Sequence, residues 1–308
     1  MISLNQVRTL IEVARSGSVG AAAERLVVSQ PAVSSALAGL QKAIGAAVVE
    51  RDGRGIRLTP SGERLVAYGR RIIALLDEAV VESRAAAAPD AGRVKLSAVT
   101  TAAEQLLPAL LSGFRAIAGA IDVELHVANK DRVWDRLNHW EADLVLAGRP
   151  PQDGHFRTVA VRANSVVVVG LPGRRYDLQD LARATWLLRE AGSGTRETTR
   201  DVFAQLSIAP PAVTIGSNGA IRECVRAGLG ISLLSRDAVA REIAEGTLAE
   251  IPTAITPLVR DWHLVESTDR DTPPGAERFV DYAIATGTFA PASRPGETDA
   301  TPKRSKNG

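Results

Sequence analysis

A short segment near the N-terminus, residues 29–40, constrains the fold and function of this chain more than any other. Ser29 stands directly before Gln30 and Pro31, and a serine hydroxyl followed by a first-turn proline is a typical start of a helix. Apolar side chains then recur at steps of four, three and four residues, at Val33, Leu37, Leu40 and Ile44. This spacing predicts a helix that begins near Gln30 and buries one face.

The opposite face of this helix carries small or hydrogen-bonding side chains, at Gln30, Pro31, Ser34, Ser35, Ala38 and Lys42. Such a face can approach the edges of DNA bases closely, and glutamine suits adenine while serine suits several bases. We therefore expect the helix to enter the major groove. Its predicted DNA contacts are Gln30, Pro31, Ser34 and Ser35.

Two further helices are predicted upstream. The spacing of Leu4, Val7, Ile11 and Ala14 is typical of a helix, and Gly17 can end it in the left-handed conformation. Ser18 can then start a second helix over residues 19–26, which only three residues separate from Gln30. The order is helix, short turn and recognition helix.

Residues 48–58 are two short apolar runs around a glycine-rich turn, which predicts a hairpin. Three arginines, Arg51, Arg54 and Arg57, make it a basic wing that can contact phosphates. Residues 1–75 contain ten Lys or Arg and five Asp or Glu, whereas the whole chain has a net charge of only +2. The positive charge is therefore concentrated where DNA would lie, and residues 1–60 are expected to form a winged helix-turn-helix domain.

The next segment, residues 61–88, is predicted to be a linker helix. Its apolar positions alternate in steps of four and three, at Leu65, Gly69, Ile72, Leu76 and Ala79, as in a seam for another helix. A helix of about 25 residues is about 38 Å long, too long for the winged domain to cover. We expect it to form a dimer, and the alternative is that it packs on the effector domain of its own chain.

Residues 89–93, which follow Ala88 and contain Pro89 and Gly92, are expected to be a hinge. Strand and helix patterns then alternate over residues 94–99, 104–117, 123–127, 132–140 and 144–146, and again over 166–169, 186–188, 196–206, 213–215, 221–227 and 231–234. This pattern predicts parallel α/β structure in two lobes. Residues 291–308 lack large apolar side chains and are expected to be a disordered tail.

Three loops at predicted strand ends could line a cleft between the lobes. Parallel sheets bind ligands where strands end and helices present their N–H groups. The loops supply hydroxyl, amide and guanidinium donors and few carboxylates, which favours a small anion, although each loop alone could be an ordinary helix cap. The predicted effector-binding residues are Thr100, Thr101, Arg149, Ser193, Thr195, Arg196 and Asn218.

Several classes of function lack support in the sequence. The four histidines have no metal-binding spacing, Cys224 is the single cysteine, and the loop at residues 192–196 lacks the Gly-Lys-Thr end of a nucleotide-hydrolysing motif. No apolar run reaches the length of a membrane span, and the N-terminus lacks a signal-peptide pattern. We expect a cytoplasmic protein that is not an enzyme and has no cofactor, metal or membrane partner.

The N-terminal pattern resembles the LysR-type transcriptional regulators. It comprises Val13-Ala14, Gly17-Ser18, Ala22-Ala23, Leu26, Ser29 to Ser34, Leu40, Gly45, Arg51 and Leu58-Thr59. It departs from the family at Val48-Val49, where Leu-Phe is usual, and at Gln41, where Glu is usual. Segments 142–151, 189–196, 216–218 and 227–231 look like the subgroup that governs Calvin-cycle carbon-fixation operons, and the full resemblance spans about residues 3–288.

The resemblance implies a homodimer or homotetramer, joined through the linker helix, that binds double-stranded operator DNA. It also implies a periplasmic-binding-protein-like effector domain, with residues 94–163 and 265–290 in one lobe, residues 164–264 in the other, and crossovers at 156–161 and 258–265. Its ligand would be a phosphorylated metabolite or a nucleotide bound between the lobes. Two alternatives are a solute-binding receptor, which leaves residues 1–88 without a role, and a cleft enzyme. An enzyme would need a set of catalytic groups, and Glu190, Glu197 and Cys224 form no recognised set.

Overall fold

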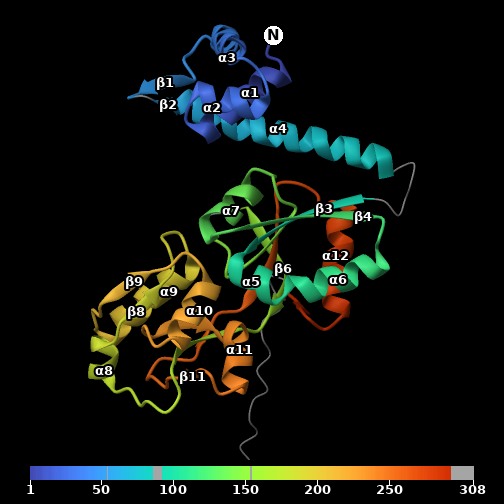
Figure 1. Cartoon of the computed structure of the whole chain (residues 1–308). Coiled ribbons are helices and arrows are strands. Elements are labelled where there is room, and N and C mark those ends of the chain that lie inside the picture. The colour runs from blue at the N-terminus through green and yellow to red at the C-terminus, as the bar shows by residue number, and fades with distance from the viewer. Residues whose placement is uncertain (54, 86–91, 153–154, 293–308) are drawn as a thin grey trace, which may run out of the picture.

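The computed structural model describes residues 1–53, 55–85, 92–152 and 155–292. Figure 1 shows an N-terminal group of helices, the long helix α4 (Pro60–Ala85) and a two-lobed α/β part. Helix α4 lies between the N-terminal helices and the first lobe. None of the helices in these ranges is long and apolar enough to cross a membrane.

The N-terminal helices confirm the sequence prediction. They are α1 (Leu4–Ser16), α2 (Val19–Leu26) and α3 (Gln30–Ile44). The Ser18 and Ser29 hydroxyls accept hydrogen bonds from backbone N–H groups of the first turns they precede, and Gly17 ends α1 at a φ of 68°. The three helices share one apolar core with the start of α4, made of Leu10, Val13, Ala22, Ala23, Val33, Leu37, Leu40, Val48 and Val66.

The wing is also confirmed, as an antiparallel hairpin of β1 (Val49–Asp52) and β2 (Gly55–Leu58). Gln41 explains how the chain tolerates its departure from the family pattern. Its side-chain oxygen Oε1 accepts a hydrogen bond from the backbone N–H of the buried Val48 at 3.0 Å. An amide oxygen therefore holds the start of the wing, a role that needs an acceptor but no charge.

The exposed apolar stripe of α4 differs from the predicted seam in the N-terminal half of the helix. Leu65 packs against the N-terminal core, and a Cβ on Gly69 would lie 2.5 Å from Cγ1 of Val7, so both residues face their own domain. The exposed apolar stripe of α4 instead comprises Tyr68, Ile72, Leu75, Leu76 and Val80. The prediction was wrong at Leu65 and Gly69 because the first turns of α4 complete the N-terminal core.

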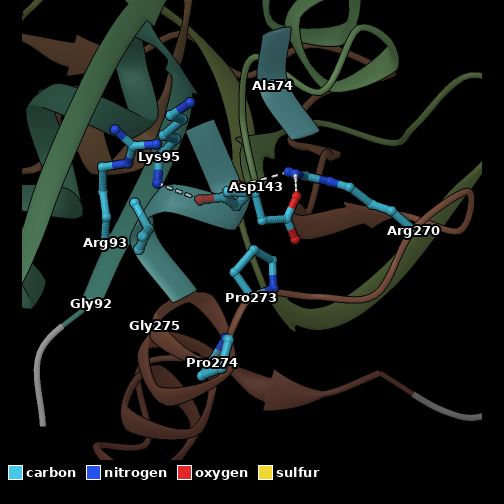
Figure 2. A pocket seen from close by; sticks show the side chains of 11 residues that line it. Ala74, Gly92, Arg93, Lys95, Asp143, Arg270, Pro273, Pro274 and Gly275 are labelled. Carbon is cyan, nitrogen blue, oxygen red and sulfur yellow. Dashed lines mark hydrogen bonds and ion pairs between the residues drawn. The ribbon is translucent and has the colours of Figure 1, made fainter. Parts of the chain in front are cut away.

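The polar side of α4 contacts the first lobe. The alternative prediction, that this helix packs on the effector domain of its own chain, therefore holds for that side. Arg270 donates to Glu78 of α4 at 3.0 Å and to Asp143 of the lobe at 2.6 Å, and the other Asp143 oxygen accepts from the backbone N–H of Lys95 at 2.7 Å. Figure 2 shows this arrangement, beside a small cavity of about 60 Å³. Further ion pairs join Lys95 to Asp77 and Arg70 to Asp135.

The first lobe contains a six-stranded sheet in the order β14-β6-β13-β5-β3-β4. Its main core packs α5, α6 and α12 against one face of the sheet, while α7 packs through a separate apolar cluster. The elements are β3 (Gly92–Val99), α5 (Thr100–Gln105), α6 (Leu107–Ile117), β4 (Ile121–Ala128), α7 (Lys130–Asn138), β5 (Leu144–Ala147), β6 (Phe156–Arg162), β13 (Trp262–Ser267), α12 (Pro274–Ala285) and β14 (Ala290–Pro291).

The second lobe is built around β7 (Ser165–Gly170), which pairs with three other strands. A parallel pair, β8 and β9, joins this sheet through a bridge between Trp186 and Ile231. The remaining elements are α8 (Leu178–Arg183), β8 (Trp186–Leu188), α9 (Gly194–Leu206), β9 (Ala212–Thr214), α10 (Asn218–Arg226), β10 (Ser232–Ser235), α11 (Arg236–Ala244), β11 (Ala249–Glu250) and β12 (Leu258–Val259).

The two-lobed α/β architecture is confirmed, but three details differ from the prediction. The first-lobe sheet is mixed, because β3 runs parallel to β4 and β5 whereas β13 runs antiparallel to β5 and β6; in the second lobe β7 runs antiparallel to its three partners, and β8 and β9 form a parallel pair. The helix predicted over 104–117 is two helices that meet at Leu106, just before Pro108. The predicted tail starts too early, since Pro291 pairs with β6, and residues 293–308 lie outside the described ranges.

The backbone conformation of Val27, at the end of α2, predicts that a glycine at this position would make the protein more stable. It is 89% exposed and has a φ of 55°, a conformation that closes the helix through the Val28 N–H bond to the Ala23 carbonyl oxygen at 3.0 Å but strains a β-branched residue. We expect Val27→Gly to raise the free energy of unfolding by about 1 kcal/mol in urea titrations. Val28→Gly is the control, and it should lower that free energy because Val28 has an ordinary φ. A Val27→Gly protein no more stable than the parent would contradict the claim that the backbone of Val27 is strained.

Candidate DNA interface and effector cleft

The predicted base-reading residues lie together on one exposed face of α3. Gln30, Pro31, Ser34 and Ser35 are exposed, while Val33 and Leu37 on the opposite face are buried. The Gln30 side chain lies close to Gly20 of α2, where an added Cβ would be 3.3 Å from its Nε2. The side-chain amide of Gln30 therefore lies at the junction of α2 and α3. The face it borders is free to meet a duplex.

The wing presents two of its three predicted arginines. Arg51 and Arg57 are exposed, and Arg54 lies outside the described residues. Arg57 stands opposite Glu50 in the hairpin and pairs with it at 2.9 Å. A phosphate contact by Arg57 must therefore compete with a carboxylate of its own hairpin, a competition that the sequence prediction did not include.

A cleft of about 540 Å³ separates the two lobes, large enough for a metabolite. Five of the seven predicted effector residues line it: Thr100, Thr101, Arg149, Ser193 and Thr195. They come from the end of β3, the segment after β5 and the start of α9. Strand ends from both lobes therefore meet at one crevice, as expected.

The start of α9 is the part of the cleft best suited to an anion. Ser193 precedes the helix but its side chain makes no capping hydrogen bond, so the first N–H groups of α9 lack a side-chain acceptor. Gly192 turns the chain into the helix at a φ of 80°, where a side chain would be strained. Free N–H groups and the helix dipole both favour negative charge at this point.

Arg196 and Asn218 are not among the residues that line the cleft. Arg196 turns away, and its Nη1 donates to the backbone oxygen of Arg189 at 2.6 Å and to Thr214 at 3.1 Å. Asn218 is buried, and its Nδ2 donates to Thr101 Oγ1 at 2.5 Å, which joins the two lobes. The start of α10 is therefore joined to the lining of the cleft through Thr101, and its own N–H groups are capped by the Ser217 hydroxyl.

The expectation of few carboxylates in the cleft was wrong. Glu197, Asp201 and Asp261 line it, each already bound to a neighbour. Glu197 pairs with Lys130 at 2.7 Å, Asp201 with Arg260 at 3.5 Å, and Asp261 accepts from the backbone N–H of Asn164 at 3.3 Å. A cation therefore compensates the charges of Glu197 and Asp201, whereas Asp261 meets only a backbone N–H.

Arg149 is the cation of the cleft that stays free for a ligand. Among the described residues it makes no ion pair, whereas Arg189 is buried and donates twice to Glu190, at 2.7 and 2.8 Å. Burial lowers the pKa of His263, which also lines the cleft; the charge of Asp261 opposes this shift and that of Arg149 adds to it. A lowered pKa favours the uncharged imidazole, so the positive charge available to a ligand is that of Arg149.

Sequence reasoning missed several lining residues, among them Asn129, Lys130, Trp134, Arg260 and His263. Asn129 and Lys130 follow β4 directly, so the strand-end rule could have found them. Arg260 and His263 lie on the second crossover, whose path between the lobes only the fold reveals. Within the described ranges no three His, Cys, Asp or Glu residues gather as a metal site.

Two family models match the chain. The description "Bacterial regulatory helix-turn-helix protein, lysR family" applies to residues 4–63, and "LysR substrate binding domain" applies to residues 87–287. The first range covers the winged domain and the second covers both lobes. These matches agree with the resemblance of the N-terminal pattern.

Two relatives point to the same subgroup as the sequence pattern. The transcriptional regulator CfxR of Cupriavidus necator is 32% identical over 290 residues, which cover 92% of this chain and 91% of the relative. The RuBisCO operon transcriptional regulator of Allochromatium vinosum is 31% identical over 293 residues, 92% of this chain and 96% of the relative. The predicted similarity to regulators of carbon-fixation operons is confirmed.

Solved structures share the fold. CbnR, a LysR family transcriptional regulator, has a TM-score of 0.65 at 22% identity and covers 92% of this chain and 99% of its own. The CcmR regulatory domain of Synechocystis, solved in complex with 2-PG, has a TM-score of 0.58 at 26% identity and covers 63% of this chain and 96% of its own.

The exposed face of α3 generates a prediction about DNA binding. Ser34→Glu places a carboxylate on the face predicted to meet bases and phosphates, and we expect it to abolish operator binding in a gel-shift titration. Ser112→Glu makes the same change at an exposed position of α6 and should leave binding unchanged. Equal operator affinity of the two variants would exclude this docking face.

Proposed function

The chain belongs to the LysR family of DNA-binding transcriptional regulators, and from this premise we propose that its interlobe cleft senses a small organic anion, such as a phosphorylated metabolite. The observation that carries the proposal is the uncapped start of α9 in the same cleft as Arg149, which has no ion-pair partner in the described part of the chain. A phosphate or carboxylate would satisfy both groups at once.

The polarity and size of the cleft support this ligand class. Thr100, Thr101, Ser193 and Thr195 add hydroxyl groups to the lining of the cleft. The volume of about 540 Å³ accommodates a phosphorylated metabolite or a nucleotide. The CcmR regulatory domain, solved in complex with 2-PG, offers a first probe molecule for this chain.

We also assign the DNA contacts and the dimer. The face of α3 with Gln30, Pro31, Ser34 and Ser35 reads bases, while Arg51, Arg54 and Arg57 bind phosphates. The apolar stripe of α4 pairs with the same stripe of a second copy, because its opposite side is already occupied by lobe 1. The protein acts in the cytoplasm on operator DNA and carries out no catalysis.

Arg149 tests the anion site. We expect Arg149→Gln to weaken 2-PG binding by about tenfold in calorimetric titration, since a charge-assisted hydrogen bond is lost. Arg115→Gln removes an equivalent charge from the exposed surface of α6 and should bind 2-PG normally. Operator affinity without 2-PG should be the same in both variants. If the wild-type protein binds uncharged molecules but neither 2-PG nor any other phosphorylated or carboxylate compound, the proposed ligand class is wrong.

Ile72 tests the dimer. It is 47% exposed in the single chain, in the middle of the apolar stripe. Ile72→Asp would bury an unpaired carboxylate in the dimer, so we expect monomers in sedimentation velocity at micromolar concentration. Leu178→Asp, at a position 53% exposed on α8, should stay dimeric. A dimeric Ile72→Asp protein would show that another surface holds the subunits.

A further inference from the structure

Helix α7 contacts a different part of the molecule at each end. It spans Lys130–Asn138, about 14 Å, within the first lobe. Its first residues line the effector cleft and face the second lobe, while its last residues face α4. The helix therefore extends from the ligand site to the helix that positions the DNA-binding domain.

The first end of α7 is held by the second lobe. Lys130 Nζ lies 2.7 Å from Glu197 Oε2, on the first turn of α9. Gly192 approaches so closely that an added Cβ would lie 2.9 Å from Asn129 Nδ2 and 3.0 Å from an Asp131 oxygen. The contact lies next to the uncapped N–H groups of α9, where the proposed anion binds.

The second end of α7 is held by α4. Asp135 pairs with Arg70 at 3.2 Å, and the backbone oxygen of Asn138 accepts from Arg71 Nη2 at 3.3 Å. Two residues on, the indole ring of Trp140 has two guanidinium groups near it, Arg71 at 5.2 Å and Arg270 at 5.9 Å from the ring centroid. Both cations come from the junction of α4 with lobe 1.

Trp140 forms part of this junction. It has a φ of 60°, a left-handed conformation that ends α7, because the Glu141 N–H donates to the Arg136 carbonyl oxygen at 2.8 Å and the Trp140 N–H to the Leu137 carbonyl oxygen at 3.1 Å. This turn places the indole ring beside Arg71 and Arg270.

Helix α7 packs on the sheet through a small apolar cluster of its own. Its buried residues Val133, Trp134 and Leu137 form a small cluster with Val145, Ala147 and Val265. This cluster is separate from the main core of the lobe, to which α5, α6 and α12 contribute. Small sliding motions of one packed helix are a common form of conformational change.

We propose that α7 transmits the state of the effector cleft to α4. An anion at the α9 N-terminus competes with Glu197 for the Lys130 ammonium group, which changes how α7 is held at its first end. The displacement reaches α4 through Asp135, the Asn138 carbonyl and Trp140, and so changes the orientation of the DNA-binding domains. The ligand step rests on the proposed function, whereas the coupling between the two ends of α7 does not.

Hydrogen exchange of the full-length protein without ligand tests this coupling. Lys130→Gln releases the first end of α7, and we expect exchange in α4, residues 66–80, to accelerate about fivefold or more. In a protein that already carries Arg70→Gln and Arg71→Gln, adding Lys130→Gln should leave the exchange rate of α4 unaltered.

Two controls separate the α7 route from general effects. Arg132→Gln removes a charge from the same turn of α7, at an exposed residue whose side chain makes no hydrogen bond or ion pair with the described part of lobe 2, and it should leave α4 exchange unchanged. Asp77→Asn breaks the α4 contact to Lys95, which does not involve α7, and the Lys130→Gln effect should persist at full size in that background.

Different results would overturn the coupling through α7 and the proposed ligand class. A Lys130→Gln effect confined to α7, or one that persists without Arg70 and Arg71, would overturn the transmission through α7. Failure of 2-PG and other anions to bind in calorimetry would instead overturn the proposed ligand class, and the exchange result would still decide the coupling.

Discussion

The Arg270 guanidinium is buried between carboxylates from two distant parts of the chain, Glu78 on α4 and Asp143 at the start of β5. Its side chain is only 9% exposed, and Asp143 is 7% exposed. A buried charge of this kind is stable only with its partners in place, and removing one partner typically costs about 3–5 kcal/mol. The orientation of α4 on lobe 1 depends on this cluster, and with it the position of the DNA-binding domain.

The same cluster explains why α4 can have two roles. The charged residues on one side of α4 form ion pairs with lobe 1: Glu78 with Arg270, Arg70 with Asp135 and Asp77 with Lys95. The apolar stripe that remains, around Ile72, is then free for a second copy. Dimerisation and attachment to the effector domain are therefore not alternatives, because they use different sides of one helix.

Features set by local chemistry could be predicted from the sequence. Ser18, Ser29 and Gly17 set helix ends through their own hydrogen bonds and backbone angles, so α1 to α3 were predicted almost residue by residue. Thr100, Thr195 and the other strand-end residues were found because strand ends collect at one edge of a sheet.

Features set by long-range packing could not be predicted in this way. Gly69 looks like a dimer position until the fold brings Val7 against it, and Arg196 looks like a ligand contact until the fold places Thr214 beside it. The mixed sheet order arises because the crossovers pass between the lobes, which no local pattern encodes. The Lys130–Glu197 pair joins residues from different lobes and has no local signature.

The distance between α4 and lobe 1 tests this account most directly. Spin labels at Glu63→Cys on α4 and Glu104→Cys on α5, in a Cys224→Ser background and diluted with unlabelled protein, report that distance by pulsed electron resonance. We predict one narrow distribution for the wild-type cluster and a broad one after Arg270→Gln, with the lobes still folded by circular dichroism. An equally narrow distribution in the Arg270→Gln protein would contradict the claim that this buried ion cluster holds α4 in place.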